Sequence, residues 1–376
     1  MLDRNNCRAP LRETESNSNA KQRQRTGILP RRGFLAAGLG SAILSTSANA
    51  QPVDQANGDS AEEEPNLTVR RLPREVRIAT VCQNGVRADT PEQMVAAMLR
   101  RCSSAVTQKP DLVCLPEVFP CVNLNSGKRP ALQQVAGSPL CQLTQPVADF
   151  ARHHKCYIVC PTYTQHDGKF FNTAILFDRT GRVAGEYHKV RLTPGEVEKG
   201  LTPGPEQPQV FETDFGKLGC QICFDIEWLD GWQRLRDAGA EIVVWPSAFA
   251  GGRMVNTMAY LHRYVVVSST RKDTSKVCDI DGTSLAKTSR WNRWAVTTVN
   301  LEKAFLHTWP FVSRFNEIHS KYGAAIRITT HPEEEWSIIE SRSPDVLVAD
   351  VLKEFELEQI DQFLARAEAK QESARG

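Results

Sequence analysis

The sequence lacks the features that mark membrane-spanning or nucleotide-binding proteins. No apolar run in its 376 residues reaches the roughly 18 residues that a membrane-spanning helix needs. It has neither a GxGxxG loop nor a GxxxxGK[ST] loop, so binding of nucleotide phosphates is not indicated. No internal repeat is present. With 41% hydrophobic and 24% charged residues, the composition is that of an ordinary globular protein.

An excess of basic charge is also missing once the first fifty residues are set aside. The whole chain has 46 Lys and Arg against 44 Asp and Glu, a formal net charge of +2. Residues 1–50 hold eight of the basic and three of the acidic residues, which leaves 38 and 41 in the remainder, a net charge of −3. We therefore expect no nucleic-acid partner.

Residues 1–50 have the pattern of an export signal rather than of a fold. Pro30-Arg31-Arg32-Gly33-Phe34-Leu35 opens a mildly apolar run that ends near Leu44, and Ala48-Asn49-Ala50 offers a small-x-small cleavage site. The arginine pair predicts a twin-arginine signal peptide, with the twin-arginine export machinery as a partner and a periplasmic or extracellular location. The alternatives are a leader with a chance arginine pair, or an uncleaved anchor. Residues 51–73 are polar, acidic and proline-containing, which predicts a linker.

The eleven cysteines show no disulfide framework. Several lie inside apolar, strand-like runs, where a thiol behaves as a small buried hydrophobe. His153, His154, Cys156 and Cys160 are close in sequence, but the histidines end a predicted helix and the cysteines lie in a predicted strand. A shared tetrahedral site is poorly supported by that arrangement. We therefore expect no metal and no cofactor.

Predicted strands alternate with predicted helices from residue 74 to residue 308, which favours an α/β fold with mixed sheets. The character of the sequence changes after about Trp309. Residues 311–345 are polar, Val346–Val351 has the pattern of a strand, and Glu354–Lys370 has that of an amphipathic helix. We interpret residues 309–376 as a C-terminal extension that packs on the core or on a partner subunit.

Three predicted strands end in a chemically reactive residue. Leu112–Leu115 leads to Glu117, Glu186–His188 leads to Lys189, and Leu218–Ile222 leads to Cys223. Ligands of α/β proteins gather outside the carboxyl ends of strands. A carboxylate beside a thiol can take its proton, and an ammonium group can hold the oxyanion of a tetrahedral intermediate. Together the three groups would make an acyl-transfer site without a metal or a cofactor.

These motifs resemble the carbon–nitrogen hydrolase (nitrilase) superfamily. The resemblance rests on Leu115-Pro116-Glu117, Tyr187-His188-Lys189-Val190-Arg191-Leu192 and Gly219-Cys220-Gln221-Ile222-Cys223-Phe224-Asp225. Flanking agreement comes from Phe171-Asn172-Thr173-Ala174 and from Val243-Val244-Trp245-Pro246-Ser247-Ala248. It covers about residues 75–305 and implies a four-layer α-β-β-α sandwich that assembles into homodimers or larger homo-oligomers.

The resemblance also implies roles for single residues. Glu117 would be the general base, Lys189 the oxyanion stabiliser and Cys223 the nucleophile. A second glutamate is expected between Lys189 and Cys223, and Glu198 fits the glutamate-then-Pro-Gly pattern best, with Glu196 as the alternative. Substrate-binding positions would be taken by Asn172, Phe224, Trp245 and Ser247, with the backbone N–H of Phe224 as a second oxyanion donor.

Departures from the family pattern bear on the substrate. Ile226-Glu227 stand where carbamoyl-amino-acid hydrolases tend to carry arginines, which makes a substrate carboxylate held at that place doubtful. Phe224-Asp225 replaces the Trp-Glu of true nitrilases, which favours an amide or ureido compound over a nitrile. The sequence thus predicts an exported, thiol-dependent amidohydrolase that acts on a small amide-like molecule. The alternatives are an inactive scaffold with a binding or structural role, and an amine acyltransferase.

Overall fold

The computed structural model describes residues 71–207 and 209–376. The predicted signal peptide at 1–50 and all but the end of the predicted linker at 51–73 lie outside the described residues. None of the helices in the described part of the chain has the length and apolarity to cross a membrane.

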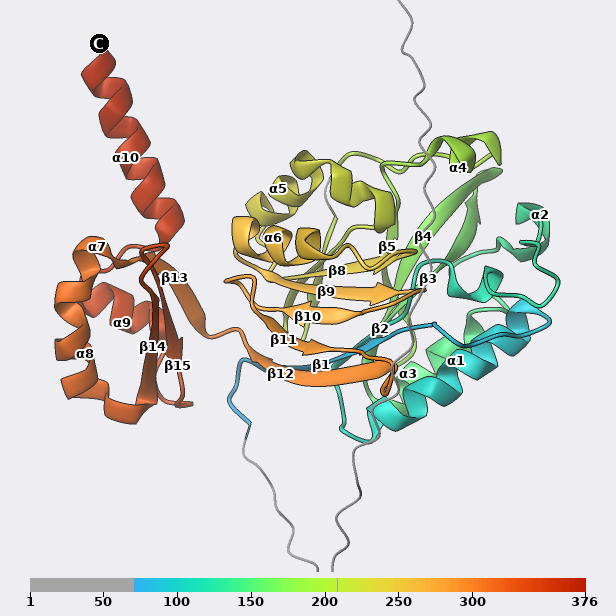
Figure 1. The fold of residues 1–376 in the computed structure, drawn as a ribbon, viewed down its shortest axis with the longest axis horizontal. Coiled ribbons are helices and arrows are strands. Elements are labelled where there is room, and N and C mark those ends of the chain that lie inside the picture. The colour runs from blue at the N-terminus through green and yellow to red at the C-terminus, as the bar shows by residue number, and fades with distance from the viewer. Residues whose placement is uncertain (1–70, 208) are drawn as a thin grey trace, which may run out of the picture. The chain divides into compact units, whose positions relative to one another are not determined.

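Strands of the described chain form two large sheets and one small sheet (Figure 1). The first sheet has, in spatial order, β12 (Trp294–Asn300), β1 (Glu75–Val81), β2 (Leu112–Cys114), β3 (Tyr157–His166), β4 (Lys169–Phe177) and β5 (Val183–His188). The second has β11 (Ser284–Lys287), β10 (Lys276–Cys278), β9 (Val265–Thr270), β8 (Ile242–Ser247), β7 (Gly216–Cys220) and β6 (Val210–Thr213).

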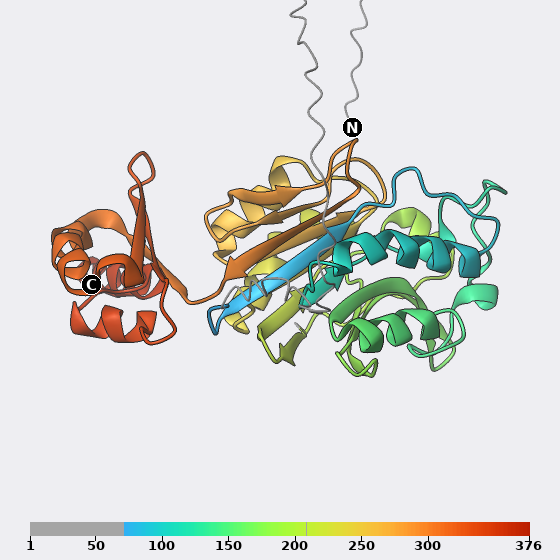
Figure 2. The ribbon, with the colours of Figure 1, turned by 90° about the horizontal axis from the view of Figure 1, so that it is seen from below.

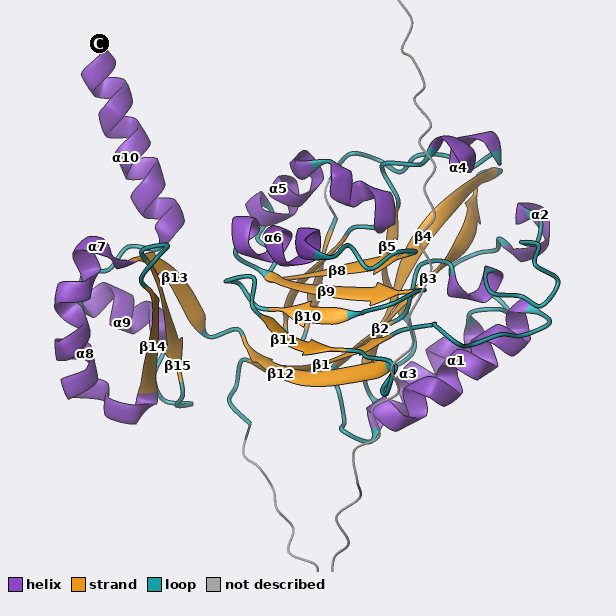
Figure 3. Ribbon diagram, in the orientation of Figure 1, coloured by secondary structure: helices purple, strands orange, loops and turns teal. Residues whose placement is uncertain are grey.

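Helices cover the outer face of each large sheet, and the sheets face each other across an apolar core. Residues of both sheets, such as Val76 and Val244, share one buried cluster. A second cluster joins the first sheet to α1 (Pro91–Val106) and α3 (Gln145–His154), which lie side by side in Figure 2. A third joins the second sheet to α5 (Leu229–Asp237) and α6 (Arg253–His262). Figure 3 shows the strands between these helix layers, so the α-β-β-α sandwich is confirmed.

Strand direction brings the ends of the predicted motif strands to common edges. β2 and β3 are parallel, and β5 runs in the same direction because β3–β4 and β4–β5 are both antiparallel. The carboxyl ends of β2 and β5 therefore emerge at one edge of the first sheet. In the second sheet β7, β8 and β9 are parallel to one another, so their carboxyl ends share an edge as well. The chain's reactive residues follow these strand ends.

Residues after β12 build a third, smaller sheet with its own core. This sheet has the order β13 (Lys303–His307), β15 (Trp336–Ser341) and β14 (Ile326–His331). Its helices include α8 (Phe315–Tyr322), α9 (Val348–Glu354) and α10 (Ile360–Arg375). A buried cluster that includes Leu306, Ile318, Ile339 and Val351 holds these elements together. We call residues 303–376 the C-terminal module.

The secondary structure of this module differs in part from the one that the sequence predicts. The predicted strand at Val346–Val351 overlaps helix α9, and the polar stretch 311–345 contains a helix and two strands. A short apolar run fits a strand or a buried helix equally well, and here its apolar residues pack on the module's sheet as a helix face. The predicted terminal helix begins at Ile360, six residues later than expected.

Candidate active site

Two glutamates, one lysine and one asparagine form a buried hydrogen-bonded cluster at the edge of the first sheet. The Lys189 ammonium group donates to Glu117 Oε1 at 3.1 Å and to Glu196 Oε2 at 2.8 Å. Asn172 Nδ2 donates to Glu117 Oε1 at 3.0 Å and to Glu196 Oε1 at 2.9 Å. Lys189 is 1% exposed and Glu117 is 3% exposed. One cationic and one neutral donor thus hold two carboxylates together out of water.

The charges of this cluster balance one another. Burial by itself would lower the pKa of Lys189, but Glu117, Cys223 and Glu196 outweigh it and raise the pKa above its usual value. Burial would likewise raise the pKa of Glu196, but Lys189 outweighs it and the pKa is lowered. Arg271 adds a second cation, since its Nη2 lies 3.3 Å from Glu117 Oε2. Lys189 is therefore an ammonium group, and Glu196 is a carboxylate.

Cys223 lies on a sharp turn directly after β7. Its backbone φ is +48°, in the left-handed region that non-glycine residues rarely adopt, and a short 3-10 helix begins at the same residue. The side chain is 7% exposed. Burial raises the pKa of the Cys223 thiol to about 12, Glu117 adds to this rise, and Lys189, the Ala248 N–H and the Ser247 hydroxyl oppose it. The resting sulfur is therefore a neutral thiol whose pKa is influenced by both the Glu117 carboxylate and the Lys189 ammonium group.

Asp225 fixes this turn to the segment that follows β5. Its carboxylate accepts hydrogen bonds from Ile222 N–H at 2.8 Å, from Arg191 N–H at 2.7 Å and from the Tyr187 hydroxyl at 2.8 Å. Burial raises the pKa of Asp225 to about 6 in spite of these three donors. Asp225 belongs to the Cys223 motif, but the sequence alone assigned it no role. Its position two residues after Cys223 was the feature that could have indicated one.

The predicted substrate-binding residues lie around the turn, in different roles. Asn172 is in the hydrogen-bonded cluster. Trp245 is fully buried and its indole N–H donates to the Cys223 carbonyl at 3.0 Å, so it supports the turn from behind. Ser247 is also buried, next to the Cys223 sulfur, and accepts from Phe249 N–H at 3.1 Å. Phe224 is half-buried, with its ring against Trp228 at 5.0 Å.

The structure places Glu196 in the cluster, whereas Glu198, which the sequence pattern preferred as the second glutamate, is exposed. Both belong to helix α4 (Pro194–Glu198). Glu196 is at the third position of this helix, where it accepts from the N–H and hydroxyl of Thr193 at 2.9 and 3.0 Å while contacting Lys189. Two residues further along a helix the side chain has turned by about 200°, so Glu198 points away. The structure thus places Glu196, the alternative residue, on Lys189, and leaves Glu198 exposed.

Within the described residues, one group of side chains has the composition of a metal site, and it lies apart from this cluster. Ligand atoms of His166, Glu186 and His188 lie within 4.8 Å of one another. His166 Nε2 and Glu186 Oε2 are already hydrogen-bonded at 2.9 Å. Glu186 and His188 flank Tyr187, which packs in the core between the sheets, so they occupy the opposite face of β5.

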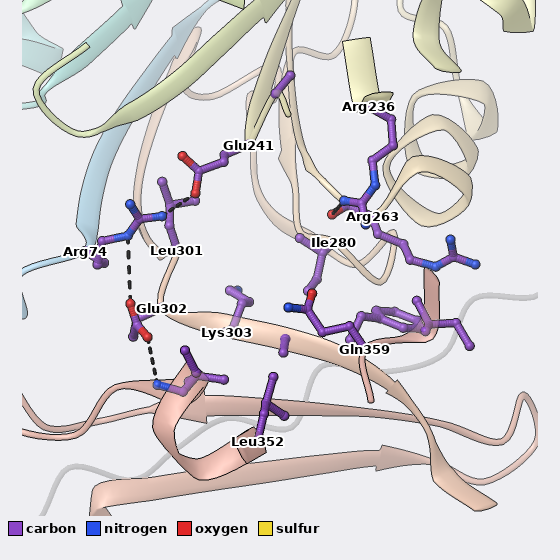
Figure 4. A pocket seen from close by; sticks show the side chains of 16 residues that line it. Arg74, Arg236, Glu241, Arg263, Ile280, Leu301, Glu302, Lys303, Leu352 and Gln359 are labelled. Atoms are coloured by element: carbon purple, nitrogen blue, oxygen red, sulfur yellow. Dashed lines mark hydrogen bonds and ion pairs between the residues drawn. The ribbon is translucent and has the colours of Figure 1, made fainter. Parts of the chain in front are cut away.

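A cavity lies beside the C-terminal module, and none of the cluster residues line it (Figure 4). Its volume is about 320 Å³, and Arg74, Glu241, Glu302 and Lys303 are among its lining residues. Its charges are largely neutralised in place. Arg74 pairs with Glu241 and, at 4.0 Å, with Glu302, while Lys303 contacts Asp279 at 2.7 Å. None of the described residues that line it carries a thiol, hydroxyl or imidazole group.

Known proteins of similar sequence include omega-amidases, which match over part of their length. The omega-amidase NIT2 of Homo sapiens is 28% identical over 162 residues, which are 40% of this chain and 57% of that protein. The omega-amidase NIT3 of Saccharomyces cerevisiae is 27% identical over 47% of this chain and 65% of that protein. The chain thus spans less than two thirds of the length of these curated relatives.

Solved structures show the same fold at low sequence identity. An amidase from Nesterenkonia sp. has a TM-score of 0.54 and 21% identity, covering 68% of this chain and 98% of that one. Saccharomyces cerevisiae Nit3, of the nitrilase superfamily, has a TM-score of 0.51 and 21% identity, covering 61% and 91%. The family model described as carbon-nitrogen hydrolase matches residues 78–306, which include the whole cluster and Cys223. The chain belongs to the carbon-nitrogen hydrolase family.

Proposed function

We propose that this protein hydrolyses the C–N bond of a small amide through a thioester on Cys223. One observation carries the proposal: a neutral, buried thiol on a strained turn is under the electrostatic influence of a carboxylate and an ammonium group that are hydrogen-bonded to each other at 3.1 Å. A buried ion cluster costs desolvation free energy, so it is a poor way to gain stability. Its composition is instead what acyl transfer to a thiol requires.

The first half-reaction transfers the acyl group to sulfur. Glu117 takes the proton of the Cys223 thiol as the sulfur attacks the carbonyl carbon of the amide, and the C=O electron pair moves to oxygen. The Lys189 ammonium group and the N–H of Phe224 hold this oxyanion. The protonated Glu117 then gives its proton to the departing nitrogen, the C–N bond breaks, and ammonia or an amine leaves. Because the resting thiol is neutral, a base is required at this step.

The second half-reaction releases the acid. Glu117, ionised again, takes a proton from a water molecule that attacks the thioester, and the second oxyanion occupies the same donors. Collapse of this intermediate breaks the C–S bond, and the proton held by Glu117 returns to the sulfur. Glu196 and Asn172 hold Lys189 and Glu117 in place throughout. The net reaction consumes one water and converts the amide to a carboxylic acid and an amine.

The relatives support an amide rather than another C–N compound. Two of the similar sequences bear the name omega-amidase, and the similar structures include an amidase from Nesterenkonia sp. with the acetamide moiety of fluoroacetamide bound covalently at its active site cysteine. In this chain Cys223 lies three residues after β7 of the second sheet. We extend the amide preference, though not any particular substrate, to this protein.

Cys223→Ala tests the proposal against an inactive scaffold. We expect ammonia release from a panel of aliphatic amides, ureides and nitriles to fall at least about 10³-fold, with an unchanged melting temperature. Cys141→Ala is the matched control, since Cys141 is a half-buried free thiol outside the cluster. Mass spectrometry of the wild type should find an acyl group on Cys223. Ammonia release that survives in purified Cys223→Ala, or a wild type that turns over none of the panel, would refute the proposal.

We further propose that the protein is exported and that it acts as a homo-oligomer. Export is supported by Arg31-Arg32, the apolar run after them and Ala48-Asn49-Ala50, and oligomerisation by the family resemblance. A reporter fused to residues 1–50 should leave the cytoplasm of a host with a twin-arginine system, and Arg31→Lys with Arg32→Lys should keep it inside. Light scattering after size-exclusion chromatography measures the assembly. An unexported reporter or a monomer would contradict the respective statement.

A further inference from the structure

Two histidines and a glutamate gather on the face of the first sheet that lies opposite the core between the two large sheets. His166 ends β3, while Glu186 and His188 are two residues apart on β5 and so project from the same face of that strand. One ligand atom of each side chain lies within 4.8 Å of the other two, and all three residues are partly buried. Imidazole nitrogen and carboxylate oxygen are ligands with which proteins bind Zn²⁺ through three side chains.

The carboxylate of this group has no lysine or arginine beside it. In the described part of the chain, the Glu186 carboxylate has one side-chain partner, His166 Nε2 at 2.9 Å, and 21% of the glutamate side chain is exposed. Histidine binds metals as the neutral imidazole. With both imidazoles neutral the group has one negative charge, which attracts a divalent cation.

Two buried hydroxyl groups fix the orientation of one of the imidazoles. Thr173 Oγ1 is hydrogen-bonded to His188 Nδ1 at 3.1 Å, and Thr164 Oγ1 to Thr173 Oγ1 at 2.6 Å. Both threonines are fully buried. Because Nδ1 of His188 takes part in this hydrogen bond, Nε2 is the ring nitrogen left for a metal. Metal-binding histidines usually have such a hydrogen bond at the second nitrogen, which sets the tautomer and the direction of the ring.

An aromatic ring borders the group on one side. The centroid of Phe171, on β4, lies 4.4 Å from that of His188 and 6.1 Å from that of His166. An apolar border limits the access of water to a bound ion. Two ligand atoms of a tetrahedral Zn²⁺ ion lie about 3.4 Å apart, so the three side chains would have to draw together only slightly. His166, with 37% of its side chain exposed, has room for that movement.

We propose that His166, Glu186 and His188 bind a Zn²⁺ ion, with water as a further ligand. The ion would connect the end of β3 to β5 across β4, and would stabilise the strands that carry Asn172 and lead to Lys189. It would lie on the opposite side of the sheet from the core that contains Cys223. The ion therefore takes no part in the proposed hydrolysis, and this inference stands apart from that function.

Metal binding to the purified protein, after its metal has been removed with a chelator, tests the proposal. Co²⁺ serves as a spectroscopic substitute for Zn²⁺. We expect visible absorption without the intense near-ultraviolet band that a thiolate ligand gives, and we expect one equivalent of Zn²⁺ to abolish it. A thiolate band in the Co²⁺ spectrum would place the ion on cysteines and overturn the proposal.

Variants locate the ion. His166→Gln and Glu186→Gln each remove a ligand and should weaken Zn²⁺ binding, measured by competition with a chromogenic chelator, by about 100-fold or more. Thr173→Val removes only the hydroxyl at His188 and should weaken binding by about 10-fold, as expected for a group that orients a ligand. His319→Gln is the matched control, since this exposed histidine belongs to the C-terminal module, and it should leave the affinity unchanged.

Melting temperatures distinguish a metal site from a pair of side chains that is only hydrogen-bonded. Zn²⁺ should raise the melting temperature of the chelator-treated wild type by several °C, because the ion binds the folded state. The same addition should leave that of His166→Gln unchanged. A wild type whose melting temperature does not respond to Zn²⁺, or equal responses of wild type, His166→Gln and Glu186→Gln, would overturn the proposal. Neither readout depends on amide turnover, so failure of the proposed hydrolysis would be seen separately.

Discussion

The sandwich and the C-terminal module treat charged side chains in different ways. The sandwich buries Glu117, Lys189 and Asp225 almost completely, at 3%, 1% and 1% exposure. Among the described charged residues of the module only Glu340 is as deeply buried, and several ion pairs are exposed, such as Lys321 with Glu354. Burying paired charges seldom gains stability, because the cost of leaving water offsets the attraction. The comparison indicates that the sandwich keeps its charges for chemistry, while the module is held together by its apolar core.

Lys189→Met should have the largest effect, because it removes the cation that two buried carboxylates share. We expect kcat to fall by about 10³-fold or more with the loss of the oxyanion donor. We also expect unfolding to become easier by about 3–5 kcal/mol, since Glu196 loses its cation and Glu117 keeps only the contact with Arg271. Amide turnover and urea unfolding measure the two effects. A variant as stable as the wild type would show that removing the cation from the buried cluster does not lower the free energy of unfolding, which would contradict the comparison.

A matched pair of glutamate variants sharpens the distinction between buried and exposed charge within one short helix. Glu196→Gln keeps the shape but weakens the hold on Lys189, and kcat should fall by about 10- to 100-fold. Glu198→Gln changes an exposed side chain two residues away and should alter neither kcat nor the melting temperature. Steady-state kinetics of both purified variants decide the matter. Reversed results would restore Glu198 as the second glutamate.

The sequence predicts well which site residues follow strands, and it predicts poorly which residue of helix α4 belongs to the site. Glu117 and Cys223 follow short apolar strands that are visible in the sequence, and strand direction then determines where they emerge. Glu196 and Glu198 lie in a five-residue helix whose rotation about its own axis no sequence pattern records. Arg271 is harder still to predict, since it follows a strand of the second sheet and only the folded sheets bring it to 3.3 Å from Glu117.

The same limit applies to the C-terminal module. The apolar residues of Val346–Val351 fit a strand as well as a helix, because the run is too short to show a helical or a strand periodicity. What makes it a helix is the sheet of β13, β14 and β15 on which Val348, Val351 and Leu352 pack. Tertiary packing therefore determines the secondary structure of a segment whose local sequence pattern is ambiguous. The family motifs end before this region, since the match covers residues 78–306.

Asp225 allows the cost of a buried charge to be measured directly. Burial raises its pKa in the folded protein to about 6, against about 3.9 in an unfolded chain. The folded state therefore holds this proton more tightly, and the resulting stability is complete below about pH 4 and is lost as the pH rises through 6. The free energy of unfolding that Asp225 contributes should fall by about 1–3 kcal/mol between pH 4 and pH 7.

Asp225→Asn isolates that contribution, because asparagine does not titrate. Urea unfolding of the wild type and the variant at several pH values gives the difference in unfolding free energy, in which the other titrating groups cancel. The difference should shift in favour of the wild type as the pH is lowered. A difference that stays constant from pH 4 to pH 7 would show that the hydrogen bonds from Ile222, Arg191 and Tyr187 offset burial in full.

Asp361→Ala should have the smallest effect, because it removes an exposed pair of the kind that the module uses. Asp361 lies in the first turn of α10, pairs with Arg236, and accepts from Arg263 at 2.9 Å, with 48% of its side chain exposed. Pairs of this kind contribute about 0–1 kcal/mol. We expect a melting temperature lower by about 2 °C at most and an unchanged kcat/KM.

Arg263→Ala is the informative counterpart, because this side chain does more than pair with Asp361. Its guanidinium group lies over the ring of Trp336 at 5.1 Å and over that of Phe305 at 5.6 Å. Contacts of a cation with aromatic faces add about 0.5–2 kcal/mol to what the exposed pair supplies. Calorimetry should therefore find Arg263→Ala clearly less stable than Asp361→Ala. Equal melting temperatures for the two would mean that the carboxylate, and not the aromatic packing, makes α10 and β15 hold to the sandwich.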